Sequence, residues 1–168
     1  MDFLELSRSR FSVLDYEDRP VEREKIEKIL DAGIYAPTAC NFQPQRVLVI
    51  DDEERKEKLN RVVPSRYTLP LAFLICYDKR KCWIRPMDGK PSGDIDASIA
   101  ATHMMLEATE LGLGSIWVMY WDGEKMKAEF ELSDDIEPTA LLIVGYKSEK
   151  AKPRQGHLTR KSKESILL

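Results

Sequence analysis

One segment limits the possible folds of this chain more than any other, the apolar run at residues 71–77 (LAFLICY). A continuous apolar run of this length has the pattern of a buried strand. The rest of the chain is therefore expected to supply the neighbouring strands and the helices that cover it.

The hydrophobic pattern predicts these other elements. Short apolar or β-branched runs predict strands at residues 46–50, 115–121 and 139–146. Helical spacing predicts helices at residues 21–34, 53–63, 94–114 and 123–130. Helices and strands alternate, so the predicted class is α/β or α+β, with helices packed on one sheet. The chain has 168 residues without a repeat or linker, which predicts a single domain over residues 1–168.

The helix predicted at residues 94–114 is apolar on almost every side. Asp94 or Asp96 can cap its start, and Gly112 or Gly114 its end. A helix of this kind is buried, either in the core or in a subunit interface. One stripe runs along it at alternating steps of four and three residues: Ile95, Ile99, Thr102, Leu106, Thr109 and Leu113.

Charge and composition exclude several classes of protein. The formal net charge is −3, which disfavours general binding to duplex nucleic acid. No apolar run approaches the ~18 residues of a membrane span, and the first residues do not resemble a signal peptide, so we expect a cytoplasmic protein. Residues 147–163 carry seven basic side chains and one acidic one. This segment suits a small anion or phosphate, and a solvated terminus equally well.

Common catalytic and metal motifs are missing from the sequence. The three cysteines form no CxxC pair, and with two histidines they predict neither a disulfide framework nor a metal centre. Cys40 is more consistent with a small buried thiol than with a reactive one. The sequence has no GxSxG elbow and no P-loop, and the Gly112-Leu113-Gly114 segment lies between helix and strand in the wrong order for a dinucleotide fingerprint.

Three segments carry side chains suited to binding. Residues 10–12 (RFS) offer an arginine and a hydroxyl to a phosphate, although such triplets are common on surfaces. Residues 36–44 (APTACNFQP) place Thr38, Asn41 and Gln43 between two prolines, where they can meet a planar heterocycle or simply form a capped turn. Residues 117–121 (WVMYW) form an aromatic strand that suits core packing at least as well.

In this order and spacing, the three segments resemble the FMN-dependent nitroreductase family. That family shows an Arg-x-Ser-type motif, an Ala-Pro-Ser-x-x-Asn-x-Gln-Pro loop, an Asp…Ala…Gly-Leu-Gly-x-x-Trp block, a strand closing on Gly-Tyr and a basic C-terminal segment. The matching segments here are residues 10–12, 36–44, 96–117, 141–146 and 152–161. The resemblance covers residues 8–167 and implies a nitroreductase-like fold, with a central mixed β-sheet flanked by helices, in an intertwined homodimer.

The resemblance also implies a site for FMN at the subunit interface. Arg10 and Ser12, with Phe11 between them, are expected at the ribityl phosphate, which Arg160 and Lys161 complete. Pro37, Thr38, Asn41 and Gln43 are expected along the flavin ring and the ribityl chain. The backbone of Val118, Met119 and Tyr120 is expected near flavin N5.

The implied chemistry belongs to the cofactor. NADH or NADPH delivers a hydride to the flavin, and a nitroaromatic, quinone or similar small acceptor takes the electrons, so no catalytic side chain is expected. The alternatives are related flavin reactions, namely dehalogenation or flavin fragmentation, and a non-catalytic FMN-binding module. No nucleic acid and no membrane are expected as partners.

Some residues depart from the family pattern. Phe11 and Leu14 stand where many members carry basic residues. The N-terminal phosphate cluster is therefore expected to have fewer charges, so that either the C-terminal basic residues become more important or FMN binds less tightly. Met119 stands where glycine is frequent and is expected to narrow the face over the ring. The loop at residues 78–93 is short for the family; its basic residues suit an anionic acceptor or, more simply, solvent exposure.

Overall fold

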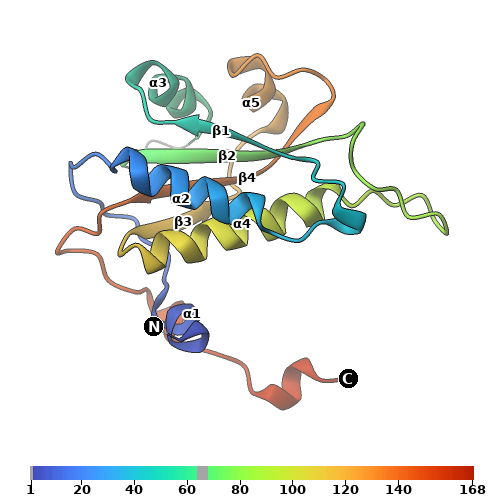
Figure 1. Cartoon of the computed structure of the whole chain (residues 1–168). Helices are drawn as coiled ribbons and strands as arrows, with labels where there is room; N and C mark the ends of the chain where they lie inside the picture. Colours follow the sequence, from blue (N-terminus) through green and yellow to red (C-terminus); the bar gives the residue numbers. More distant parts are fainter. Residues whose placement is uncertain (1, 64–67) are drawn as a thin grey trace.

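The computed structural model describes residues 2–63 and 68–168 and contains one four-stranded sheet (Figure 1). Its strands are β1 (Gln45–Ile50), β2 (Leu71–Asp78), β3 (Gly114–Val118) and β4 (Ile136–Gly145), in the order β1-β2-β4-β3. All neighbouring strands pair antiparallel. The predicted class of helices packed on one sheet is confirmed. The parallel part of the expected mixed sheet is, among the described residues, a single bridge between Ser12 and Ser115.

Strand β2 is central because both of its faces are apolar. Leu71, Phe73 and Ile75 face α2 (Arg23–Ile34) and α4 (Gly93–Glu110). Ala72 and Leu74 face the opposite side, where α3 (Glu53–Val62) and α5 (Gly123–Glu129) lie. The whole strand is buried, since successive side chains point to opposite faces and helices cover both. The sequence run therefore predicted this strand correctly.

Helix α4 packs on the sheet through small side chains, not through the stripe that its spacing emphasises. Its fully buried face consists of Ala97, Ala100, Ala101, Met104 and Ala108. Alanines let the helix backbone approach the sheet closely, so this face can be thin and still fill the core. Of the stripe that begins at Ile95, Leu113 is buried in the core, whereas Ile95 lies on the outward side and is 53% exposed. Within the described chain, α4 therefore has an apolar face that no core cluster covers.

The ends of α4 differ in part from the sequence expectation. Neither Asp94 nor Asp96 caps it, because Ser92 occupies the N-cap position and both aspartates lie in the first turn. Their carboxylates bind other elements instead. At the other end, Gly112 has φ +79°, while Leu113 N donates to Ala108 O (2.9 Å) and Gly112 N to Thr109 O (3.0 Å). These two hydrogen bonds form a Schellman C-cap, so Gly112 is the predicted stop.

Several further elements were not predicted. They are α1 (Phe3–Ser9), η1 (Ala39–Asn41), α6 (Gln155–Leu158) and η2 (Lys163–Ile166). Helix α1 begins with a capping box between Asp2 and Glu5, a signal that is readable in the sequence. Strand β3 is shorter than expected and ends at Val118, so Met119 and Tyr120 lie outside the sheet. No helix in the described ranges has both the length and the apolarity that a membrane crossing demands.

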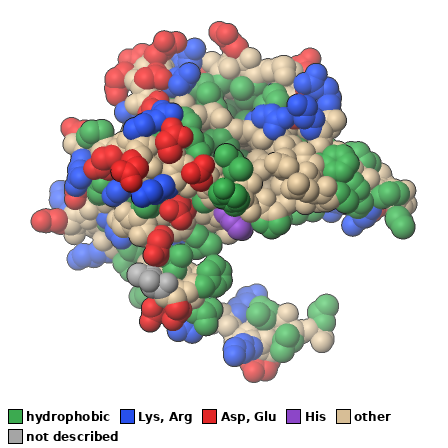
Figure 2. Space-filling model, viewed as in Figure 1, with side chains coloured by type: hydrophobic (Ala, Val, Ile, Leu, Met, Phe, Trp, Pro, Cys, Tyr) green, Lys and Arg blue, Asp and Glu red, His purple; other side chains and the backbone are tan. Residues whose placement is uncertain are grey.

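Two segments stand away from the body of the molecule. The arm at residues 79–92 is a narrow loop closed by a bridge between Ile84 and Pro91, and it carries the exposed Met87. The C-terminal segment leaves the region below α1 and ends in exposed Ile166, Leu167 and Leu168. Figure 2 shows hydrophobic side chains on both segments, where the body of this chain does not cover them.

Replacing Met104 tests which face of α4 forms the core. Met104→Ala is expected to lower the free energy of unfolding by about 2–5 kcal/mol, because it leaves a cavity beneath the sheet. Met87→Ala is the matched control, since Met87 is 89% exposed, and should change it by less than about 0.5 kcal/mol. Urea denaturation followed by circular dichroism measures both, and equal losses would contradict this placement of the core.

Candidate functional site

A cavity of about 450 Å³ lies between the start of the chain, β3 and the C-terminal segment. It brings Arg10, Ser12 and Arg160, three of the predicted phosphate ligands, together from opposite ends of the sequence. The other residues that line it are Leu14, Ile116, Trp117, Arg154, Gly156 and His157. The sequence pattern did not indicate Arg154 or His157 as ligands, although both belong to the basic segment.

Backbone pairing fixes the N-terminal half of this cavity. Ser12 forms a parallel bridge with Ser115 on β3, and Val13 N donates to Ser115 O at 3.0 Å. Arg10 caps α1 through its backbone N–H, which donates to Leu6 O at 3.2 Å. Arg10 and Ser12 are thus held at the edge of the sheet. Helix α6 lies near α1 and carries the C-terminal half of the cavity.

The charged side chains that line the cavity are all basic. Three arginines line it and no carboxylate does, and no ion pair within the described part of the chain engages Arg10, Arg154 or Arg160. Burial, and then the positive charge of Arg160, lower the pKa of Arg10 from its usual value. Guanidiniums held this close repel one another, so an anion between them relieves the repulsion. The cavity is therefore built to accept an anion.

Two other residues that were expected at the phosphate, Phe11 and Lys161, do not line this cavity. Phe11 does not line the cavity; its ring meets the imidazole of His157 edge-on, with centroids 6.1 Å apart. Lys161 is exposed and also lies outside the cavity lining. Arg154, which lines the cavity, adds a third arginine there.

The loop at residues 36–44 has an unusual backbone. Cys40, Asn41 and Gln43 have φ values of 50°, 56° and 50°, in the left-handed region that non-glycine residues rarely occupy. Thr38 Oγ1 accepts from Gln43 N at 3.1 Å, and Gln43 Nε2 donates to Asn41 O at 3.3 Å. Cys40 is exposed, so the expectation of a buried thiol is wrong. The left-handed turns project the side chains of Asn41 and Gln43 into solvent.

Asp96 anchors this loop to the first turn of α4. One carboxylate oxygen accepts from Ala39 N at 2.9 Å, and the other accepts from Ser92 Oγ at 2.7 Å. The side chain is buried, with 1% exposure, so its hydrogen bonds act in a low-dielectric setting. Asp96 is thus a positioning residue for the loop, a role that neither its possible place as a cap nor its place at the start of the 96–117 block indicated.

The third predicted cluster follows the end of β3. Val118 is buried, while Met119 and Tyr120 are 63% and 71% exposed. The indole of Trp121 donates to Val118 O at 3.0 Å and turns the chain away from the sheet. Met119 and Tyr120 line an open cavity of about 550 Å³ together with Arg61, Val62, Val63, Trp121 and Asp122.

Within one chain, these clusters do not form a single site. The loop is attached at Asp96, near the start of α4, whereas Arg10 shares a small cavity with Thr109 and Leu113 at the end of that helix. Thirteen residues of helix separate Asp96 from Thr109, which is about 20 Å. The cavity that Arg10 lines with Ser12 and Arg160 does not include Asn41.

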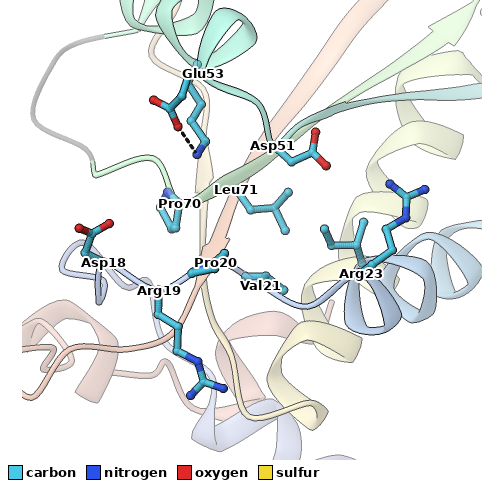
Figure 3. A pocket seen from close by; sticks show the side chains of 11 residues that line it. Asp18, Arg19, Pro20, Val21, Arg23, Asp51, Glu53, Pro70 and Leu71 are labelled. Atoms are coloured by element: carbon cyan, nitrogen blue, oxygen red, sulfur yellow. Dashed lines mark hydrogen bonds and ion pairs between the residues drawn. The ribbon is translucent and has the colours of Figure 1, made fainter.

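Two other regions are less suited to an anion. Three of the five basic residues of the arm are already paired: Lys79 with Glu137, Arg80 with Asp78 and Asp135, and Arg85 with Asp88. Figure 3 shows a different cavity of about 420 Å³, where Lys56 pairs with Glu53 and other charges of both signs surround an apolar floor. None of the predicted site residues lines that cavity.

Comparison with known proteins gives a consistent result. The family model described as "Nitroreductase family" matches residues 7–69 and 67–146. A crystal structure of a nitroreductase family protein from Clostridium difficile 630 has a TM-score of 0.93 and 46% identity, covering 100% of this chain and 98% of that one.

Two curated relatives carry more specific names. A protein of Archaeoglobus fulgidus, whose name includes NADH dehydrogenase/NAD(P)H nitroreductase, is 32% identical over 161 residues, covering 88% of this chain and 87% of its own. A Bacillus subtilis protein named FMN reductase [NAD(P)H] is 28% identical over 163 residues, covering 85% of this chain and 66% of its own.

Substitution of Asp96 tests its control of the loop. Asp96→Ala leaves Ala39 N–H without its acceptor and should lower the free energy of unfolding by about 1–3 kcal/mol. Amide exchange at residues 36–44 should become faster. Asp96→Asn should retain most of the protection, because the amide can accept from Ala39 N and donate to Ser92 Oγ. Asp51→Asn, at an exposed site, is the control; unchanged exchange in Asp96→Ala would contradict this role.

Proposed function

The chain belongs to the nitroreductase family, and on that premise we propose that it binds FMN, with the 5′-phosphate in the cavity formed by Arg10, Ser12, Arg154 and Arg160. The carboxylate-free arginine cluster is the observation that carries this proposal. A phosphate monoester is nearly a dianion at neutral pH and is best bound by two or more cationic donors. The chain is an NAD(P)H-dependent flavin oxidoreductase by family; FMN and the residues that bind it are the proposal.

The remaining predicted residues would contact other parts of FMN, some through hydrogen bonds and others through apolar contact with the ring. Asn41 and Gln43 offer amide donors and acceptors to the polar edge of the flavin and to the ribityl hydroxyls, with Pro37 and Thr38 shaping the loop. The segment from Val118 to Tyr120 covers the ring, with the exposed Met119 narrowing access. When bound, FMN takes reducing equivalents from NADH or NADPH and passes them to a nitroaromatic, quinone or similar small acceptor. No side chain of this chain needs to act as an acid or base.

We propose further that the working form is a homodimer with each FMN at the subunit interface. One chain holds its arginine cluster and its loop about 20 Å apart along α4, so a partner's loop must complete each site. Within the described chain, large apolar side chains are exposed on all three segments: Ile95 on α4, Ile84 and Met87 on the arm, and Ile166, Leu167 and Leu168 in the C-terminal segment. In this proposal, residues 1–168 of each subunit form one FMN-binding domain. The protein is cytoplasmic and has neither nucleic acid nor a membrane as its partner.

A visible absorption scan tests the function directly. Purified protein, with added FMN, should show flavin bands shifted from those of free FMN, and anaerobic NADH or NADPH should bleach them. Bound flavin that neither nucleotide bleaches would contradict the enzyme assignment. A protein that FMN leaves colourless would contradict the cofactor assignment.

Two arginine variants test the phosphate site. Arg10→Ala and Arg160→Ala should each weaken FMN binding about ten- to a hundredfold, because a charge-assisted hydrogen bond contributes about 1.5–3 kcal/mol. Riboflavin lacks the phosphate, so its affinity should change little. Arg23→Ala, an exposed arginine paired with Glu27 on α2, is the matched control. Fluorescence titration measures each constant, and equal effects on FMN and riboflavin would contradict the phosphate assignment.

Mixed dimers test whether the site is shared between subunits. Arg10→Ala and Asn41→Ala homodimers should each bind FMN weakly or with an altered spectrum. A mixed dimer of the two should regain about half of the normal sites, because one site receives both substitutions and the other receives neither. Differently tagged chains, co-expressed and purified in sequence, give this species. No recovery would show that each site lies within one chain.

A further inference from the structure

Two buried carboxylates, Asp78 and Asp96, join the arm at residues 79–92 to the loop at residues 36–44. Asp78 ends β2 and Asp96 lies in the first turn of α4, so the arm runs from one carboxylate to the other. The two residues are only 3% and 1% exposed. The arm and the loop lie at the same end of the molecule (Figure 1). The inference drawn from this junction rests on the proposed function, in which the loop meets the flavin.

At the end of the arm, Asp96 holds one residue of each segment. Its Oδ1 accepts from Ala39 N of the loop at 2.9 Å, and its Oδ2 accepts from Ser92 Oγ of the arm at 2.7 Å. Ser92 N donates in turn to Trp83 O at 2.9 Å, so Ser92 is part of the folded arm. One carboxylate therefore connects the first half of the loop to the end of the arm.

At the start of the arm, Asp78 makes an equivalent connection. Its Oδ1 accepts from Arg80 N at 3.0 Å and from Arg80 Nε at 3.2 Å. On the loop side, Asp78 N donates to Pro44 O at 2.9 Å, and Asp78 Oδ2 lies 4.0 Å from Arg46 Nη2. Arg46 Nη1 donates to Gln43 O at 3.3 Å. Asp78 thus reaches the second half of the loop both directly and through Arg46.

The arm is itself braced by internal contacts. A bridge joins Ile84 to Pro91, and Arg85 N donates to Lys90 O at 3.0 Å. The side chain of Arg85 also pairs with Asp88. Because energetic coupling travels through hydrogen-bonded and rigid elements, a braced arm can connect the two carboxylates from its own side.

The loop needs such outside support because its own backbone is unfavourable. Cys40, Asn41 and Gln43 have positive φ values, which non-glycine residues keep only where the surrounding structure holds them. The contacts of the two carboxylates provide this constraint at Ala39 and at Pro44. Asn41 and Gln43, the residues expected at the flavin, lie between these two points of attachment.

We propose that the arm is a positioning element of the flavin site, which holds the loop at residues 36–44 in shape through Asp78 and Asp96. Arg80 and Ser92 are then positioning residues that contact no part of the flavin themselves. The loop is expected at the ring and the ribityl chain, so a change in the arm should alter the binding of FMN and of riboflavin equally. A substitution in the arginine cavity, by contrast, should act on the phosphate alone.

Substitutions on the arm side of the junction test the proposal without altering the loop. In the full-length protein, the Arg80→Ala/Ser92→Ala double variant should weaken the binding of FMN and of riboflavin about three- to tenfold each and shift the visible bands of the bound flavin. Arg80→Lys should lose less than Arg80→Ala, because an ammonium can still donate to Asp78. Arg85→Ala, on the same arm but paired with Asp88, is the matched control and should leave both constants unchanged. Fluorescence titration measures each constant.

Two further backgrounds separate positioning from a general loss of stability. In an Asn41→Ala/Gln43→Ala protein, the arm substitutions should have no further effect on riboflavin affinity, because the side chains that they position are gone. In an Arg10→Ala protein, they should weaken FMN binding by the same factor as in the wild type. Urea denaturation checks that each variant is folded. If the double arm variant is not, Arg80→Ala alone is used, since that side chain is 65% exposed.

The other outcomes separate this inference from the function on which it rests. Unchanged affinities and spectra in the arm variants, with altered ones in Asn41→Ala/Gln43→Ala, would overturn the role of the arm and leave the flavin site intact. A loss for FMN alone, or an equal loss with and without the two amide side chains, would also overturn it. If the wild-type protein binds neither flavin, the proposed function fails and this inference fails with it.

Discussion

The packing of α4 against the sheet determines where everything else in the candidate site can lie. Its alanine face fits closely beneath β2 and β4, so the helix cannot shift without opening the core. The loop at residues 36–44 is tied to its first turn through Asp96, and the segment that follows α1 lies beside its last turn. A rigid helix of 18 residues therefore sets the distance between the two halves of the site.

The arginine cavity concentrates positive charge in an otherwise acidic protein. The chain as a whole has a net charge of −3, yet no carboxylate lines this cavity. Elsewhere, most arginines near a carboxylate form ion pairs, as Arg61 does with Glu129. Within the described residues, no ion pair neutralises the three guanidiniums, which repel one another, and the proposed phosphate would relieve that repulsion. The folded chain thus has a positively charged cavity before any ligand binds.

The sequence predicted the strands well because their signal is local. The run at residues 71–77 alternates between two covered faces, and nothing outside the segment is needed to recognise it. The sequence predicted the residues of the arginine cavity less completely. Arg154 and His157 lie near Arg10 only because the C-terminal segment folds back to the start of the chain. The anchoring role of Asp96 was equally hidden, because its partner Ala39 lies 57 positions away. Contacts between distant segments do not appear in hydrophobic periodicity.

The outward stripe of α4 connects these observations. Periodicity showed that the helix is apolar on more than one side and left the core and a subunit interface as alternatives. The structure assigns the alanine face to the core, so the face that carries Ile95 remains for another partner. The arm and the C-terminal segment expose apolar side chains as well, and the loop and the arginine cluster lie too far apart to share one ligand within a chain. A second copy, packed against the face that carries Ile95, would account for the exposed apolar side chains and the divided site together, which is why we propose the homodimer as the unit that binds FMN.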